Sequence, residues 1–325
     1  MPPLRTKVSA AGNTLGVMSA RTAWGHGLAT VSNETVLDTY FAAVSLGAPD
    51  GSANPHQAAS DSLRGVDLVP ITVEIELDAA PASTADAYLR LHLLSHLAVL
   101  PNSMNLDGIF AHLPNVAWTT HGPVDAAVFD AKRREFQAAG VSIVSLDKFP
   151  RLVDYVLPER VRIADAQRVR LGAYLAPGTT VMHEGFVNFN AGTLGTSMVE
   201  GRISQGVVVG DGSDIGGGAS IMGTLSGGGT ERVSIGERSL LGANSGIGIS
   251  IGDDCIVEAG LYLTAASKVV LIDAALTAAG THPTVKAVEL SGQANLLFRR
   301  NSLSGAIEVL SRSGQGISLN AALHA

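Results

Sequence analysis

Several features that would place the chain in a familiar class are scarce or missing. Cys255 is the only cysteine in 325 residues, so no disulfide framework holds the fold, and a reducing, cytoplasmic compartment is expected. Aromatic residues make up 5% and charged residues 16% of the chain, where about 25% charged is usual. No apolar run approaches the ~20 residues of a membrane span, and the N-terminus carries no secretory signal pattern.

Basic residues are too few for a nucleic-acid-binding protein. Lysine and arginine number 22 against 29 aspartate and glutamate residues, which gives a formal net charge of −7. The field of such a chain repels polyanions, and no run of basic residues marks a track for a phosphate backbone. Neither nucleic acid nor a membrane is therefore expected as a partner.

Glycine, by contrast, is abundant and unevenly placed. Residues 163–269 hold 22 of the 37 glycines but only one proline, Pro177. This shift predicts three parts: an N-terminal α/β domain over 1–160, a β-helix domain over 161–270 and a C-terminal extension over 271–325. In the first part, alternation predicts a strand at 69–77, and apolar stripes predict helices at 84–100 and 125–139, the second with Gly140 as its C-cap.

The central segment repeats every six residues. Aliphatic side chains recur at Ile163, Val169, Leu175, Val181, Val187, Ile203, Val209, Ile215, Ile221, Ile235, Leu241, Ile251, Val257 and Leu263. In 11 of these 14 hexads the residue four places on is small, and glycine often follows the aliphatic residue directly, where a bend is crowded. This period predicts a parallel β-helix, in which three hexads close a triangular coil and coils stack about 4.8 Å apart. A glycine-rich β-sandwich or a low-complexity segment explains the regularity less well.

Three breaks interrupt this six-residue frame. Residues 193–202 read as an insertion of four residues that contains Glu200, residues 227–234 as an insertion of two, and residues around 247–250 as a skip of the frame. Extra residues must bulge from a closed coil, and functional side chains concentrate in such excursions. The breaks are therefore the predicted locations of a site.

Longer strings make the resemblance to one family specific. They are RIADA (162–166), LGAYLAPGT (171–179), VMHEGFVN (181–188), GTSMVEGR (195–202), GGGASIMGTLSGG (216–228), LGANSG (241–246), VEAGLY (257–262) and NLLFRRNS (295–302). The chain resembles the tetrahydrodipicolinate N-succinyltransferases of the actinobacterial type. This resemblance implies a left-handed β-helix, a homotrimer with active sites between subunits, and transfer of succinyl from succinyl-CoA to the amine of ring-opened tetrahydrodipicolinate, in lysine and diaminopimelate synthesis.

Acyl transfer to an amine requires a group that accepts a proton or the acyl group, and donors for the oxyanion. His183 is the only histidine in the repeat region, so a carboxylate is the better candidate. The resemblance implies that Glu200 is catalytic, as nucleophile or as general base, and that Gly223 lets the facing subunit approach, with its N–H available to the oxyanion. The plainer alternatives are a solvated loop glutamate and a corner glycine with positive φ.

Both substrates are anions, so an acidic protein must concentrate its cations locally. The residues that the resemblance assigns to binding of the CoA donor are Arg202, Gly217, Ser220, Ala243, Glu258, Ala259, Ala266, Lys286, Arg299, Arg300, Asn301 and Ser302. Ala266 stands where relatives tend to have glycine, which puts that contact in question. Ordinary packing or surface charge is the alternative for each.

The sequence also suggests a place for a metal ion. In a trimer, three copies of Glu184 could meet near the three-fold axis and hold Mg²⁺, which prefers oxygen ligands. Relatives tend to supply a second acid, but Gln167 stands at the matching position here. A structural role for Glu184 is the alternative.

The residues of the repeat region argue against two functions other than acyl transfer. A γ-type carbonic anhydrase needs three zinc-binding histidines from the repeats, and only His183 is there. A purely structural β-helix would not need breaks that carry Glu, Arg and Gly. Another CoA-dependent N- or O-acyltransferase stays open as the alternative, because fold does not fix substrate.

Overall fold

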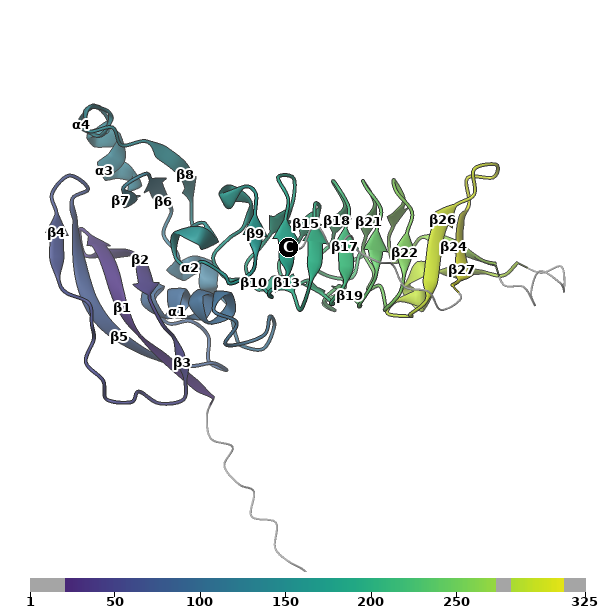
Figure 1. Cartoon of the computed structure of the whole chain (residues 1–325), viewed down its shortest axis with the longest axis horizontal. Coiled ribbons are helices and arrows are strands. Elements are labelled where there is room, and N and C mark those ends of the chain that lie inside the picture. Colours follow the sequence, from purple (N-terminus) through teal and green to yellow (C-terminus); the bar gives the residue numbers. More distant parts are fainter. Residues whose placement is uncertain (1–20, 273–281, 313–325) are drawn as a thin grey trace, which may run out of the picture.

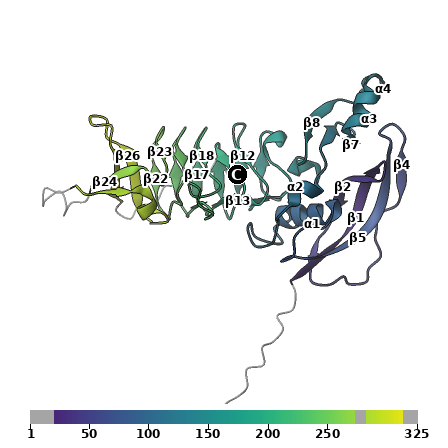
Figure 2. The same ribbon diagram turned by 180° about the vertical axis from the view of Figure 1, so that it is seen from behind.

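The computed structural model describes residues 21–272 and 282–312. Three parts follow one another along its long axis: a sheet-and-helix part at the N-terminal end, a stack of flat coils, and a hairpin cap at the other end (Figure 1). The view from behind shows the same order (Figure 2). The larger of the two hydrophobic cores in the described residues runs from Ala23 in the first strand to Val309 in the last, so the coils and most of the N-terminal part share their interior.

The N-terminal part contains two antiparallel sheets. The larger has the order β2-β1-β5-β4, with β3 also paired to β1. Its strands are β1 (Thr22–Ser32), β2 (Thr35–Phe41), β3 (Ser45–Leu46), β4 (Ala59–Asp61) and β5 (Val66–Glu76). The strand predicted at 69–77 corresponds to β5, which begins three residues earlier and ends one residue earlier. The smaller sheet has the order β7-β6-β8, from β6 (Val116–Thr119), β7 (Gly122–Asp125) and β8 (Ile143–Asp147). Because every strand pair is antiparallel, this part is α+β rather than the predicted α/β.

Both predicted helices form, but with different ends. The first is α1 (Thr84–Ser95), which stops five residues early because Leu97 takes a left-handed backbone with φ of 59°. The second is divided at Lys132 into α3 (Ala126–Ala131) and α4 (Arg133–Ala138). Gly140 follows α4 with φ of 74°, in agreement with its predicted capping role. A short helix, α2 (Ile109–His112), lies between them in sequence. Among the described residues, no helix is long and apolar enough to cross a membrane.

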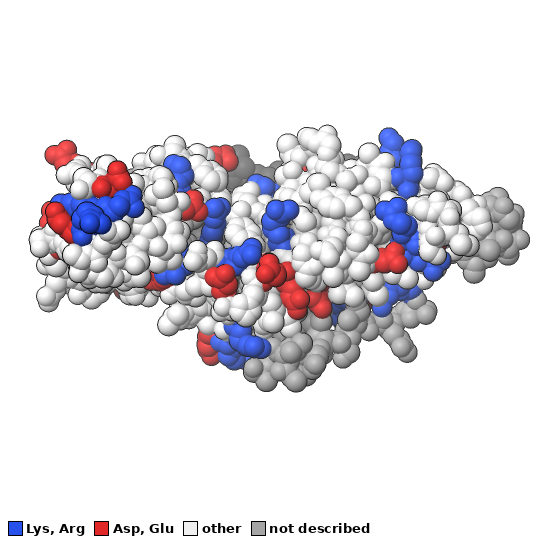
Figure 3. All heavy atoms as spheres, turned by 90° about the horizontal axis from the view of Figure 1, so that it is seen from above, with Lys and Arg blue, Asp and Glu red and all other residues white. Residues whose placement is uncertain are grey.

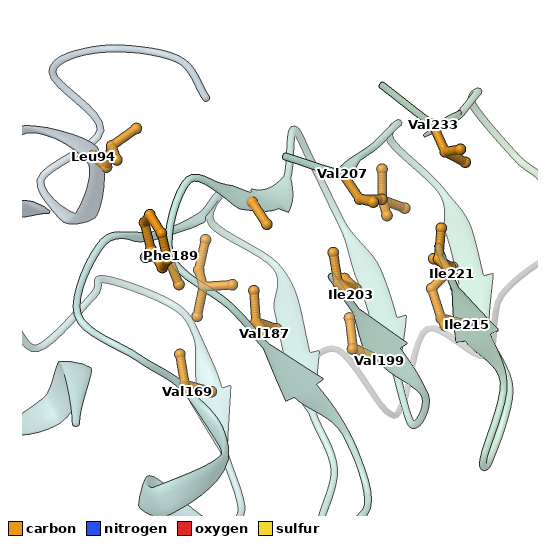
Figure 4. Close-up of a cluster of buried hydrophobic side chains, with 14 of the residues drawn as sticks. Leu94, Val169, Val187, Phe189, Val199, Ile203, Val207, Ile215, Ile221 and Val233 are labelled. Atoms are coloured by element: carbon orange, nitrogen blue, oxygen red, sulfur yellow. The ribbon is translucent and has the colours of Figure 1, made fainter. Parts of the chain in front are cut away.

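Helix α1 anchors the N-terminal part to the first coil. The hydroxyl of Ser95 accepts a hydrogen bond from Gly172 N (2.8 Å) and donates one to Ala173 O (3.2 Å). Leu94 of α1 and Phe189 of the coil belong to the same cluster of buried side chains (Figure 4). Three short 3₁₀ helices, η1 (Leu152–Asp154), η2 (Ala166–Arg168) and η3 (Ala287–Leu290), flank the coils.

The coils form a parallel β-helix with three faces, as the hexads predicted. The first face holds β9 (Arg162–Ile163), β11 (Thr179–Val181), β14 (Ser197–Val199), β17 (Ser213–Ile215), β20 (Leu240–Leu241) and β22 (Ile256–Val257). The second holds β12 (Phe186–Val187), β15 (Arg202–Ile203), β18 (Ser220–Ile221), β21 (Gly246–Ile247) and β23 (Tyr262–Leu263). The third holds β10 (Ala173–Leu175), β13 (Ala191–Thr193), β16 (Val208–Val209) and β19 (Ser234–Ile235). We call the corner from first to second face edge 1, and the corner from second to third face edge 2.

The predicted aliphatic positions fill the prism. Of the 14, 13 are buried and Ile163 is partly buried. Val187, Ile203 and Ile221 lie inside successive coils (Figure 4). The glycines after them are explained by the next coil: a Cβ on Gly216 would lie 2.6 Å from Leu241 O, so only glycine lets the coils stack this closely.

The first and third frame breaks are shortened corners. Thr193 and Val199 occupy further hexad positions, beside Leu175 and Val181, and Ile203 then follows Val199 after four residues instead of six. The prediction of a four-residue insertion at 193–202 is therefore wrong: the corner loses two residues. At the third break Ile247 keeps the frame, and the step from it to 251 is again four residues.

The second break is a larger insertion than predicted. Ile221 and Ile235 are 14 residues apart where a hexad has six, so eight residues are added rather than two. They form a hairpin-like excursion at edge 2, closed by a bridge between Thr224 and Arg232.

A small cap closes the C-terminal end of the prism. It consists of β24 (Lys268–Ile272), β25 (Thr284–Lys286), β26 (Leu296–Arg300) and β27 (Ile307–Ser311). Strand β26 pairs in parallel with β22 and so extends the first face by one level. Of the predicted C-terminal extension, residues 273–281 and 313–325 lie outside the described residues.

Candidate active site

Edge 1 brings together predicted site residues that lie far apart in sequence. Each coil turns there directly after a strand of the first face, so one residue set lies above the next. Backbone hydrogen bonds join the levels, from Gly218 N to Glu200 O (3.2 Å), from Asn244 N to Gly217 O (2.8 Å) and from Gly260 N to Ala243 O (2.8 Å). The predicted residues on or beside this edge are Glu200, Arg202, Gly217, Ser220, Ala243, Glu258 and Ala259, with Arg299, Arg300, Asn301 and Ser302 at its far end.

Glu200 combines a fixed backbone with a free carboxylate. It sits in the shortened corner between β14 and β15, where its backbone N–H donates to Ile215 O (2.8 Å). Its side chain is half-buried and takes part in no hydrogen bond or ion pair within residues 21–272 and 282–312. A carboxylate held this way is available to a ligand.

A hollow of about 450 Å³ lies beside Glu200 on the second face. Arg202 and Ser220 line it, and Arg202 Nη2 donates to Ser220 Oγ at 2.6 Å. Arg202 is exposed and has no acidic partner in the described part of the chain. The lining of this hollow contains the guanidinium groups of Arg168 and Arg202 and the carboxylate of Glu184, while Glu200 lies next to the lining residue Gly201.

Glu184 lies on the same edge, one coil before Glu200. Its side chain is 77% exposed and faces Arg168, with Arg168 Nη2 3.4 Å from Glu184 Oε2. The residues that the structure describes contain no group of three His, Cys, Asp or Glu side chains that could hold a metal ion. One chain by itself does not fit Mg²⁺, since Gln167 adds no charge, Arg168 already faces Glu184, and the Asp165 carboxylate accepts a hydrogen bond from Gln167 N (2.9 Å).

Edge 2 carries the remaining predicted residues. Gly223 begins the inserted hairpin directly after β18, Ala266 follows β23, and Lys286 is held nearby because Ala287 N donates to Ser267 O (2.8 Å). The predicted donor-binding residues are therefore divided between two edges of the chain, with Ala266 and Lys286 on the side of Gly223.

Gly223 is required by a close approach and not by its backbone angles. It does not adopt positive φ, so that alternative is wrong. A Cβ at this position would lie 2.8 Å from Gln205 O in the preceding coil. Its carbonyl accepts from Val233 N (3.3 Å), while its own N–H donates no hydrogen bond within the described ranges. A free backbone donor at a corner suits an oxyanion.

The far end of edge 1 is basic. Arg299 pairs with Glu308 (2.9 Å), whose carboxylate also accepts from Asn301 Nδ2 (2.7 Å). The Asn301 amide, and then the Arg299 guanidinium, hold the pKa of Glu308 below its usual value. Arg300 is exposed and donates to Gly305 O (2.9 Å). Toward this end basic side chains predominate on the face drawn in Figure 3.

Sequence reasoning missed one charged residue of edge 2. Arg232 stands opposite Thr224 in the inserted hairpin, next to Gly223. The interval 227–234 was recognised as a break, but its length was misjudged, so nothing indicated that Arg232 returns to the same corner. A correct count of coil positions would have given that signal.

Comparisons with known proteins agree with this geometry. Family models describe residues 113–151 as the middle part of tetrahydrodipicolinate N-succinyltransferase and residues 232–265 as the hexapeptide repeat of succinyl-transferase. A 2,3,4,5-tetrahydropyridine-2,6-dicarboxylate N-succinyltransferase of Salinispora tropica is 58% identical over 94% of this chain and 99% of its own. One of the same name from Pseudomonas aeruginosa is 59% identical over 76% of this chain and 72% of its own.

A solved structure is also similar over most of its length. It is the crystal structure of a putative 2,3,4,5-tetrahydropyridine-2-carboxylate N-succinyltransferase from Campylobacter jejuni, with a TM-score of 0.76 and 32% sequence identity. The match covers 89% of this chain and 92% of that chain. With the hexapeptide match, this likeness identifies the coils as a β-helix of the acyltransferase type. The chain belongs to the tetrahydrodipicolinate N-succinyltransferase family.

Proposed function

We propose that the chain transfers the succinyl group of succinyl-CoA to the amine of ring-opened, hydrated tetrahydrodipicolinate, giving N-succinyl-2-amino-6-oxopimelate and CoA. The observation that carries this proposal is the 58% identity over 94% of the chain to a relative of that activity. The reaction belongs to lysine and diaminopimelate synthesis. The lone cysteine supports the reducing, cytoplasmic compartment that this role requires.

Glu200 is the proposed catalytic group, and two courses are compatible with its place. As a general base it takes the proton from the amine while nitrogen bonds to the thioester carbon, the carbon–sulfur bond breaks and CoA leaves as a thiolate. As a nucleophile it first displaces CoA to form an acyl anhydride, which the amine then opens. In both courses the carbonyl oxygen becomes an oxyanion, and the free N–H of Gly223 is its proposed donor.

The donor is proposed to extend along edge 1. From Glu200 to Arg299 the edge climbs four coil levels, which is about 19 Å at a spacing of ~4.8 Å. Succinyl-CoA is elongated, with its thioester at one end and its phosphates at the other. This supports a placement in which the thioester lies at Glu200, the pantetheine arm follows Gly217, Ala243 and Ala259, and the phosphates meet Arg300.

The active site is proposed to be shared between neighbours in a homotrimer of left-handed β-helices. Within one chain, Glu200 and Gly223 lie at opposite corners of the second face, separated by the extended residues 219–222, which span about 10 Å. Both must come within ~3.5 Å of one reacting carbonyl. Edge 1 of one subunit against edge 2 of the next brings them together, and joins Ala266 and Lys286 to the remaining donor contacts.

Magnesium has no part in the proposed chemistry. Three Glu184 side chains around a three-fold axis are the one arrangement that would offer Mg²⁺ several oxygen ligands. A bound Mg²⁺ would neutralise the negative charge of these three carboxylates at the axis. No step at Glu200 depends on the ion.

The proposal is tested by mixing the protein with succinyl-CoA and enzymatically generated tetrahydrodipicolinate and looking for N-succinyl-2-amino-6-oxopimelate by mass spectrometry. The product should form with the wild type and should be lost with Glu200→Gln. Acetyl-CoA, which lacks the succinyl carboxylate, serves as the control acyl donor. Acylation from acetyl-CoA alone, or of another amine or hydroxyl only, would instead favour a different CoA-dependent acyltransferase. Light scattering should give three times the 33.4 kDa of the chain, and a stable monomer would contradict the shared site.

A further inference from the structure

A second hollow lies at edge 2, beside Gly223, and neither the family match nor the donor assignment accounts for it. Its volume is about 390 Å³, and its lining includes Gln205, Arg232, Phe189, Asn102, Asp107 and Phe110. The coils supply the first three of these residues, and the N-terminal part supplies the others. The hollow is therefore bounded on one side by the corner that carries the proposed oxyanion donor.

The backbone and its packing hold Arg232 at this corner. Residue 232 forms the bridge opposite Thr224, and the next residue, Val233, donates to Gly223 O (3.3 Å). Gly206 leaves room for its side chain: a Cβ there would lie 2.8 Å from Arg232 Cδ. The guanidinium Nη1 donates to Gln205 Oε1 (3.0 Å). Arg232 is thus directed along the corner and away from the prism.

Asp107 lines the same hollow as Arg232, but the two side chains form no ion pair. Arg232 makes no ion pair within residues 21–272 and 282–312, whereas Arg238 and Arg299 each pair with a carboxylate. Its bond to Oε1 orients the Gln205 amide, whose Nε2 donates to nothing in the described chain. A guanidinium fork with an adjacent amide N–H₂ presents several donors on one side, which is the pattern that a carboxylate accepts.

We propose that Arg232 and Gln205 bind a carboxylate of the amine acceptor in the hollow beside Gly223. The inference rests on the proposed function, because it takes the acceptor to be a dicarboxylate. Binding there places the acceptor at edge 2, facing the Glu200 and thioester of the neighbouring edge 1. Residues 102–110 of the N-terminal part form the opposite wall and limit the length of acceptor that fits.

Steady-state kinetics of Arg232→Ala test the assignment. Loss of charge-assisted hydrogen bonds should raise KM for the acceptor about 10-fold or more, while KM for succinyl-CoA stays within twofold. Arg232→Lys keeps the positive charge but loses the forked guanidinium, so its KM for the acceptor should lie between those of the wild type and of Arg232→Ala. Arg134→Ala, an exposed arginine on α4 at the far end of the molecule, is the matched control. An unchanged acceptor KM in a folded Arg232→Ala protein overturns the proposal.

A binding measurement separates this inference from the proposed function. Pimelate is an unreactive dicarboxylate with the seven-carbon chain of the acceptor, and its binding can be followed by ligand-observed NMR without any turnover. Wild type should bind pimelate and Arg232→Ala should not, at equal melting temperatures. If this holds but no succinylated product forms, the site stands and the proposed function fails. If product forms and pimelate binds both proteins equally, the function stands and the site fails.

Discussion

Glu200→Gln separates catalysis from stability because of where the carboxylate lies. The substitution keeps the shape of the side chain and removes its charge and its capacity to take a proton. Since the Glu200 side chain has no protein partner in the described ranges, the free energy of unfolding should change by no more than about 0.5 kcal/mol. Turnover should fall about 100-fold or more, equivalent to about 2.7 kcal/mol on the barrier.

The assay compares kcat from CoA release with the urea midpoint of the same samples. Glu159→Gln is the control, because Glu159 is an exposed glutamate in a turn before the first coil. It should leave both quantities unchanged. If Glu200→Gln turns over within a few-fold of wild type, Glu200 is not the catalytic group, and a large loss of stability would show that its side chain has a structural role.

The other predictions concern the basic end of edge 1 and a buried histidine. Arg300→Ala should raise KM for succinyl-CoA with little change in kcat, because Arg300 binds the ground state and the transition state equally. An unchanged KM would show that Arg300 is an ordinary surface charge with no role in donor binding. Arg299→Ala should also lower the urea midpoint, since it leaves Glu308, with a side chain only 9% exposed, without its cation. Burial lowers the pKa of His92 to about 3. At mildly acidic pH the imidazole is therefore protonated in the unfolded chain but stays neutral in the folded chain. Between pH 7.5 and 5.5 this should reduce the free energy of unfolding by about 1.4 kcal/mol, and a pH-independent urea midpoint would contradict it.

The repeat could be predicted from sequence because an aliphatic side chain fills each coil at a fixed interval. The frame was lost where that rule has an exception. Thr193 is fully buried at a hexad position, where its hydroxyl lies 2.6 Å from the hydroxyl of Thr179. A buried threonine whose hydroxyl is hydrogen-bonded can replace an aliphatic residue, and a search for aliphatic residues passes over it. The shortened corner after Val199 was therefore mistaken for an insertion.

The helices show a similar limit. The apolar stripe of α1 correctly placed Leu89 and Leu93 in the core. The stripe continues in sequence to Leu97, but α1 ends at Ser95 and Leu97 has a left-handed backbone conformation, with φ of 59°. Tertiary packing decides such an end, and the stripe contains no information about it.

Most site residues came from recognised strings, but their arrangement did not. Spacing along the chain does not reveal that Ala243 and Glu200 share an edge while Ala266 lies on another. That assignment requires the coil count, including both shortened corners. Arg232 was missed for the same reason, because the hairpin that returns it to Gly223 is eight residues longer than a hexad.

Subunit mixing is the measurement that tests the shared active site most directly. Glu200→Ala removes the carboxylate, and Gly223→Val places a side chain where a Cβ would already lie 2.8 Å from Gln205 O, so each variant should be inactive as a pure trimer. In a random equal mixture, about one interface in four joins an intact Glu200 to an intact Gly223. The co-expressed population as a whole should therefore recover about a quarter of wild-type activity, and purified mixed trimers, verified by native mass spectrometry, about a third, because each has one intact interface of three. Mixed trimers no more active than the parents would place both residues in one subunit's site and contradict the account.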